Sequence, residues 1–144
     1  MSFAVDANVL LYASDRGSAK NGEALRFLNR CAEGPEPFCI PWPVLMAYLR
    51  ISTHPGIFRR PLAPVAAARN VDELLALPHV RPLGETDGFW EAYREVTGTQ
   101  AFRGNMVPDA HVAAILKIHD VRTLYTSDRD FRRFDFLDVR DPFA

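Results

Sequence analysis

Short apolar runs alternate with longer helix-forming stretches along this chain, and that alternation constrains its fold more than any other feature. Strands are expected at residues 3–5, 38–40, 80–83, 123–126 and 136–139, and helices at 18–32, 43–49, 64–76, 87–96 and 108–118. Helices inserted between successive strands let those strands run parallel, with helices packed on both faces of the sheet. The pattern predicts an α/β protein.

The size and composition of the chain are typical of one globular domain. We expect its 144 residues to form a single domain over 1–144, since this length is enough to bury a core. The apolar share of 48% and charged share of 24% argue against disorder, and no apolar run reaches the ~20 residues of a membrane helix. The N-terminus lacks a basic segment before its first apolar run, so we expect a cytoplasmic protein without a membrane partner.

Cysteines and net charge exclude other classes of function. Cys31 and Cys39 match no metal-binding or redox spacing, which predicts packed, reduced thiols. The net charge of −1 gives no overall basic field, but charge is uneven along the chain. Residues 37–71 contain no acid, whereas the last 36 residues contain seven aspartates.

Three aspartates each follow an apolar run. Asp6 follows residues 3–5, Asp128 follows residues 124–127, and Asp109 is expected in the first turn of the helix that begins at Pro108. In open α/β sheets, ligands bind outside the carboxyl ends of the strands, where Asp6 and Asp128 are expected. One aspartate alone is an ordinary cap or turn residue, so only the combination indicates a site.

Carboxylates brought together at such an edge favour a divalent cation. Like charges raise one another's pKa and destabilise a fold unless a cation neutralises them, and carboxylate oxygens suit Mg²⁺ or Mn²⁺. Such a metal can activate water and stabilise the charge that develops at a phosphate. Asn8 is a candidate to orient a carboxylate or to hold a metal-bound water. The hydroxyls of Ser127 and Thr126 either hold such a water or bond to the backbone.

The sequences VDANVLLY, VPDAHVAA and LYTSDRDF, in this order, resemble the PIN-domain family, and specifically the VapC-type toxins of bacterial toxin–antitoxin pairs. The resemblance extends over essentially the whole chain. It implies a three-layer α/β/α fold with a central parallel sheet, metal-dependent endoribonuclease activity, a VapB-like antitoxin that blocks the site, and a homodimer. It assigns metal binding and catalysis to Asp6, Asp109 and Asp128, with Asp130 as a supporting acid.

One departure from the family pattern concerns the segment 42–50. The resemblance leads us to expect a glutamate there, in a word like E-F-L-R, but the chain has Ala47-Tyr48-Leu49-Arg50. Either a distant acid, Glu85, Asp87 or Glu91, folds into the site, or the site has three carboxylates and binds metal more weakly.

Several other side chains are candidates for RNA or antitoxin binding. Arg50, Arg103 and Arg129 adjoin the motif segments and are expected to bind phosphates, whereas Arg132 and Arg133 are expected to be plain surface. His111 is a weaker acid–base candidate. Trp42 and Trp90 are expected mostly in the core, although an exposed aromatic ring could stack on a base of single-stranded RNA. One further group is expected either to form a groove for an antitoxin helix or to belong to the core: Leu45, Tyr48, Leu49, Ile57 and Phe58.

Two alternative functions stay open at this point. A PIN-like domain that lacks its glutamate could bind RNA or antitoxin without cutting. A phosphatase with Asp6 as nucleophile is disfavoured, because Asn8 stands where its second acid is expected.

Overall fold

Five short parallel strands form the central sheet of the protein. A computed structural model describes residues 1–144, and its strands lie in the order β3-β2-β1-β4-β5. The strands are β1 (Phe3–Val5), β2 (Phe38–Pro41), β3 (Val80–Leu83), β4 (Thr123–Tyr125) and β5 (Asp138–Arg140). The central strand β1 is buried along its whole length, as expected for a parallel strand covered on both faces.

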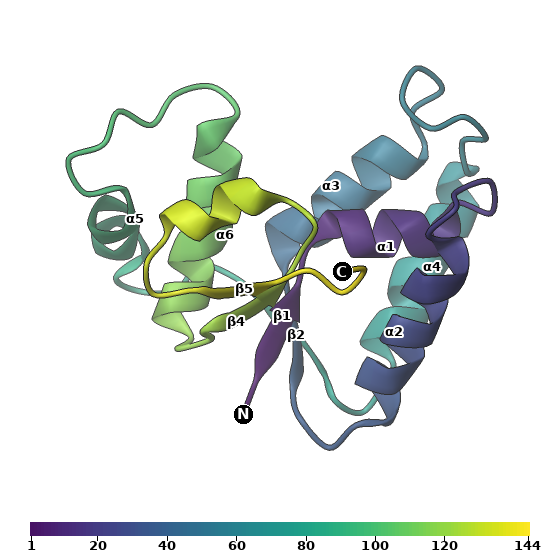
Figure 1. The fold of residues 1–144 in the computed structure, drawn as a ribbon, viewed down its shortest axis with the longest axis horizontal. Coiled ribbons are helices and arrows are strands. Elements are labelled where there is room, and N and C mark those ends of the chain that lie inside the picture. Colours follow the sequence, from purple (N-terminus) through teal and green to yellow (C-terminus); the bar gives the residue numbers. More distant parts are fainter.

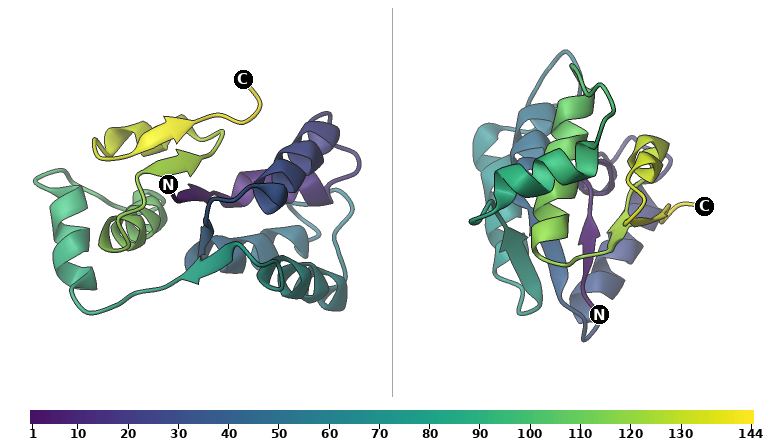
Figure 2. Two further views of the ribbon diagram at one scale, coloured as in Figure 1. Left: turned by 90° about the horizontal axis from the view of Figure 1, so that it is seen from below. Right: turned by 90° about the vertical axis from the view of Figure 1, so that its left-hand side faces the viewer.

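Helices cover the sheet on two sides. They are α1 (Ala7–Ser14), α2 (Asn21–Glu33), α3 (Trp42–Ser52), α4 (Pro64–Leu75), α5 (Phe89–Thr97) and α6 (Met106–Ile118), with a short 3₁₀ helix η1 (Arg129–Arg133) before β5. Figure 1 shows α1 to α4 gathered on one side and α5 with α6 on the other, and the views in Figure 2 show the sheet between these two layers. The expected α/β/α fold is confirmed.

Several element boundaries differ from the predicted ones for local reasons. Helix α2 begins at Asn21 instead of Ser18, because the Ser18 hydroxyl accepts the N–H of Lys20 in a turn (3.1 Å). Helix α6 begins two residues before Pro108, a position in the first turn where a proline costs no hydrogen bond. The last strand lies at 138–140, since the backbone N–H of Leu137 is used in a turn with the Phe134 carbonyl (3.0 Å).

The hydrophobic core extends across the sheet into both helical layers. Its largest fully buried side chains include Phe38, Phe131 and Phe134. The prediction that both tryptophans belong to the core was wrong: Trp42 is 40% and Trp90 59% exposed. Ring stacking on Tyr93 (centroids 5.4 Å apart) holds Trp90 at the surface of α5.

The group considered for an antitoxin groove belongs mostly to the core. Leu45, Tyr48 and Phe58 are buried and Leu49 packs against the core, while Ile57 is 57% exposed on the loop after α3. An open groove of about 680 Å³ lies nearby between α2 and α4, with Leu25, Leu28, Leu62, Leu74 and Leu77 among its lining residues. The cysteine prediction is confirmed, since both thiols are free and buried.

Candidate active site

Strand register brings the first and last motif segments together. Ala4 pairs with Leu124 and Val5 with Tyr125 across β1 and β4, and the N–H of Asp6 donates to the Tyr125 carbonyl (3.0 Å). Asp6 then caps α1, with its Oδ1 accepting the N–H of Ala7 (2.8 Å). Both ends of the chain therefore contribute to one edge of the sheet.

Thr126 connects Asp6 to Asp128. Thr126 is 1% exposed, and its hydroxyl donates to Asp6 Oδ2 (2.8 Å). The Thr126 Oγ1 in turn accepts from Asn8 Nδ2 (2.9 Å) and from the Asp128 N–H (3.0 Å). Asn8 also reaches Asp6 Oδ2 (3.3 Å) and accepts the N–H of Ser127 with its Oδ1 (3.3 Å). A fully used hydroxyl at the centre of this network fixes the Asp6 carboxylate and the turn before η1 in one arrangement.

The side chain of Asp128 converges with those of two further acids, Asp109 and Asp130. Asp109 lies in the first turn of α6, and Asp128 caps η1 by accepting the N–H of Asp130 with its Oδ1 (2.9 Å). Ligand oxygens of Asp109, Asp128 and Asp130 all lie within 4.8 Å of one another. The exposed Asp130 thus lies within reach of the same ion as Asp109 and Asp128. The family resemblance predicted only a supporting role for it, outside the metal ligands.

The carboxylates affect one another electrostatically. The pKa of Asp109 is raised to about 6, mainly by burial and then by the charges of Asp128 and Asp6; Arg133 lowers this pKa in part, and Asp130 adds a smaller increase. Burial also raises the pKa of Asp6, against the hydrogen bonds from Thr126 and Ala7, and Asp128 adds to the increase. Repelling carboxylates with raised pKa values are the donor set that a hard divalent cation stabilises.

No acid takes the place of the absent glutamate from the α3 side. Ala47 is half-buried and packs against the core. Neither Glu85, Asp87 nor Glu91 is among the charges that shift the pKa of Asp6 or Asp109. The carboxylates that lie within 4.8 Å of one another include none of these three acids, and the acid that this group adds to the predicted aspartates is Asp130.

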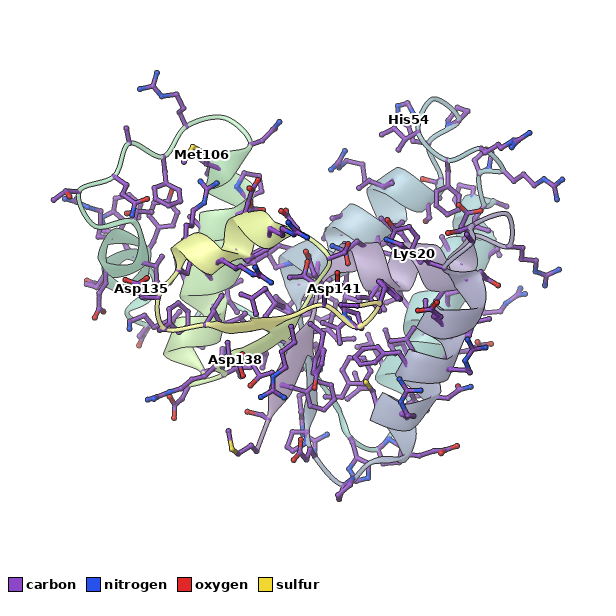
Figure 3. The ribbon with its side chains drawn as sticks, viewed as in Figure 1. Lys20, His54, Met106, Asp135, Asp138 and Asp141 are labelled. Atoms are coloured by element: carbon purple, nitrogen blue, oxygen red, sulfur yellow. The ribbon has the colours of Figure 1, made fainter.

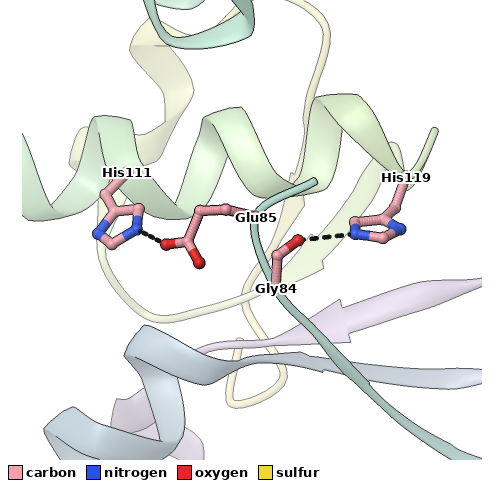
Figure 4. A network of polar contacts seen from close by, with 4 residues as sticks. All are labelled: Gly84, Glu85, His111 and His119. Carbon is pink, nitrogen blue, oxygen red and sulfur yellow. Dashed lines mark hydrogen bonds and ion pairs between the residues drawn. The ribbon is translucent and has the colours of Figure 1, made fainter. Parts of the chain in front are cut away.

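Glu85 is instead held by His111 on α6. Its carboxylate pairs with His111 Nε2, and His119 Nε2 contacts the Gly84 carbonyl at 2.9 Å (Figure 4). The pairing lowers the pKa of Glu85. These contacts tie the segment after β3 to α6 and give His111 a structural role, while its acid–base role stays a prediction.

One arginine outside the predicted set, Arg133, contacts the acid cluster. Arg50, Arg103 and Arg129 are exposed and form no ion pair within the chain, and none of them shifts the pKa of Asp6 or Asp109. Arg133, predicted to be plain surface, does reach the cluster: its Nε donates to the Asp130 carbonyl (2.9 Å) and its guanidinium lies 3.8 Å from the Asp130 carboxylate.

Sequence reasoning missed the role of Arg133, and it named Thr126 only as a candidate similar to Ser127, without its contact to Asp6. The threonine of the T-x-D-x-D-F stretch was the available signal for Thr126, but its burial depends on the pairing of β1 with β4. Arg133 follows Asp130 by three residues, and this spacing brings two side chains together in a 3₁₀ helix.

Fold and site together define an α/β/α protein with a carboxylate cluster at the carboxyl edge of its parallel sheet. A family model described as PIN domain matches residues 3–137, and the chain belongs to the PIN-domain family. Within that family it is of the VapC type, as the following relatives show.

Similar proteins cover nearly the whole chain. Ribonuclease VapC48 of Mycobacterium tuberculosis is 42% identical over 144 residues, which is 100% of this chain and 99% of the relative. Ribonuclease VapC43 of the same species is 34% identical over 96% of this chain and 93% of its own length.

Solved structures share the fold. The crystal structure of VapC20 from M. tuberculosis, described as a Sarcin-Ricin loop cleaving toxin, superposes with a TM-score of 0.68 at 25% identity, covering 96% of this chain and 98% of that one. VapBC2 from Rickettsia felis, bound to a DNA fragment from its promoter, gives a TM-score of 0.70 at 16% identity over 98% of both chains. None of the helices in this chain is long and apolar enough to cross a membrane.

Proposed function

We propose that this protein is a VapC-type endoribonuclease toxin that hydrolyses RNA phosphodiester bonds with Mg²⁺ or Mn²⁺ held by its aspartate cluster. The observation that carries the proposal is the convergence of Asp109, Asp128 and Asp130 within 4.8 Å, beside Asp6. Relatives at 42% and 34% identity, named as ribonucleases, support the RNA substrate.

The four aspartates have distinct tasks in this proposal. Asp6, Asp109 and Asp128 are the metal ligands and catalytic residues, and Asp130 completes the donor set. A divalent cation at this position would lower the pKa of a water molecule and stabilise charge that develops on the phosphate. Thr126 and Asn8 hold the Asp6 carboxylate in place, and Arg133 offsets part of the negative charge around Asp109.

Arg50, Arg103 and Arg129 are proposed to bind RNA phosphates around the cluster. Each is exposed and unpaired within the chain, so each is free to contact a phosphate. A planar guanidinium offers two parallel hydrogen bonds to such a group.

The alternative of an inert binding module is not favoured. Its basis was the alanine at position 47, but Asp130 brings the site to four acids without a glutamate on α3.

An antitoxin and a second copy of the chain are the proposed partners. One solved structure of the same fold is a toxin–antitoxin complex from Klebsiella pneumoniae. The groove between α2 and α4, lined by both apolar and polar residues, is a surface of the kind that an amphipathic helix covers. Exposed Leu25 lines this groove, while exposed Trp42 and Met46 lie four residues apart on α3, where a second copy would bury them.

RNA cleavage with matched variants tests the enzyme. Wild type is expected to cut a mixed pool of structured and single-stranded RNAs with Mg²⁺ or Mn²⁺, to stop in EDTA, and to lose activity on Asp6→Asn while that variant stays folded. The matched control is Asp72→Asn, since Asp72 is exposed on α4, outside the cluster. Undiminished cleavage by Asp6→Asn would refute the proposal.

A further inference from the structure

We infer that a small hollow beside the carboxylate cluster, lined by Ser127, Arg129 and Arg132, binds the RNA backbone phosphate next to the one that is cut. The inference rests on the proposed function and adds a second binding position to it. The hollow has a volume of about 80 Å³, several times the ~10–15 Å³ that one water molecule needs, which is room for a small group such as a phosphate.

The hollow and the cluster share their walls. Thr126 and Asp128, which belong to the hydrogen-bond network at the ends of β1 and β4, also line the hollow. A phosphate bound there would lie next to the carboxylates, as the neighbour of a scissile phosphate must.

Two arginines of η1 lie on the same side of the hollow. Side chains three residues apart nearly eclipse one another in a 3₁₀ helix, so Arg129 and Arg132 project in similar directions, as do Asp130 and Arg133. Asp130 and Arg133 neutralise each other at 3.8 Å, whereas Arg129 and Arg132 are both exposed and form no ion pair. Two neighbouring like charges repel, and an anion between them would relieve that repulsion.

A free hydroxyl and two carboxylates, those of Asp128 and Asp141, complete the polar lining of the hollow. The Ser127 hydroxyl makes no hydrogen bond within the chain and can donate to a phosphate oxygen. Asp141 also lines the hollow, at the start of the C-terminal segment after β5 (Figure 3), and its Oδ1 accepts the N–H of Phe143 (2.9 Å). The charge of Asp128 is the one that a bound cation neutralises.

These contacts assign affinity and positioning to the hollow, without sequence preference. Arginine contacts to a phosphate fix the register of a nucleic acid but do not read its bases. Arg132, expected from sequence to be plain surface, becomes a positioning residue with Arg129.

The test compares two double variants of equal charge. Arg129→Gln/Arg132→Gln removes the proposed contacts, and Arg26→Gln/Arg30→Gln removes two exposed arginines of α2 as the control. In an Asp6→Asn background with Mg²⁺, fluorescence anisotropy measures binding of a fluorescein-labelled single-stranded RNA of mixed sequence over a salt series. In the otherwise unaltered enzyme, cleavage rates give KM and kcat.

The hollow variant is expected to bind RNA about 10-fold more weakly, with the slope of log affinity against log salt reduced by about 0.7, the value for one phosphate contact on a single strand. Its KM is expected to rise about 10-fold with kcat nearly unchanged, while the control matches the parent. A hollow variant that equals the control in slope and KM would overturn the inference and leave the nuclease intact. If the unaltered enzyme cleaves no RNA, the proposed function is contradicted. The RNA affinities and salt slopes of the hollow variant and the control would still decide the inference.

Discussion

Replacing Asp109 with Asn is expected to stabilise the metal-free protein while it weakens metal binding. Burial and the neighbouring charges of Asp128 and Asp6 raise the Asp109 pKa from 3.8 to about 6. An asparagine has nearly the same shape and no charge, so it removes the repulsion that the carboxylate meets in the folded state. The chain would then gain stability at the expense of its function.

The size and sign of this effect follow from linkage. Raising a pKa from 3.8 to about 6 corresponds to about 3 kcal/mol for a fully buried group. Roughly half of that is expected for Asp109, because it is only half-buried and solvent screens part of its charge. The folded pKa lies above the unfolded one, so the penalty is absent below about pH 4, grows as pH rises to about 6, and is constant above it. At pH 7.5 the variant should gain ~1–1.5 kcal/mol, or roughly 3–5 °C in Tm.

Urea unfolding in EDTA at pH 4 and pH 7.5 measures this difference. The variant and wild type should be equally stable at pH 4 and differ at pH 7.5, and added Mg²⁺ should stabilise wild type more than the variant. Exposed Asp72→Asn is the control, expected within about 0.5 kcal/mol of wild type at both pH values. An Asp109→Asn protein that is no more stable than wild type at pH 7.5 in EDTA would refute the reasoning.

Three further substitutions test other parts of the account. Thr126→Val removes the hydroxyl that holds Asp6, so it should lower kcat at least ~10-fold and lower the free energy of unfolding in urea by about 1–3 kcal/mol. Thr126→Ser keeps the hydroxyl and should keep most of the activity. Equal activity of the two variants would contradict this role. Asp130→Asn should weaken Mg²⁺ binding about 10-fold by calorimetry, and unchanged binding would exclude Asp130 from the donor set. Leu25→Arg should abolish capture of the cognate antitoxin without changing RNA cleavage, since Leu25 lies in the groove between α2 and α4; retained capture would place the partner elsewhere.

The fold was predictable because its signals are local. Apolar runs bounded by turn residues mark the strands, and their alternation with helices requires parallel pairing. The 3₁₀ helix 129–133 was missed, since five residues are too few to show a period and the sequence around Phe131 and Phe134 also suits an extended segment. Trp42 and Trp90 were assigned to the core on residue type alone, and nothing in their local sequence shows which face of a helix lacks a partner.

Only the part of the site that follows strand ends and the start of a helix was predictable from the sequence. Asp6, Asp109 and Asp128 follow apolar runs, and the family pattern singles them out. The convergence of Asp130 on Asp109 depends on how η1 packs near α6, which is a tertiary contact without a sequence period. The central position of Thr126 likewise depends on the pairing of β1 with β4.

The chemistry of the RNA ends tests the central claim most directly. Wild type would be incubated with RNA and Mg²⁺ or Mn²⁺ in oxygen-18 water, and the product ends analysed by mass spectrometry, with EDTA and Asp128→Asn as controls. Hydrolysis by a water molecule at the aspartate cluster predicts a linear phosphate monoester that carries one oxygen-18 atom, and no product in either control. Products that end in a 2′,3′-cyclic phosphate, or cleavage that persists in EDTA, would show attack by the RNA's own 2′-hydroxyl and contradict the account.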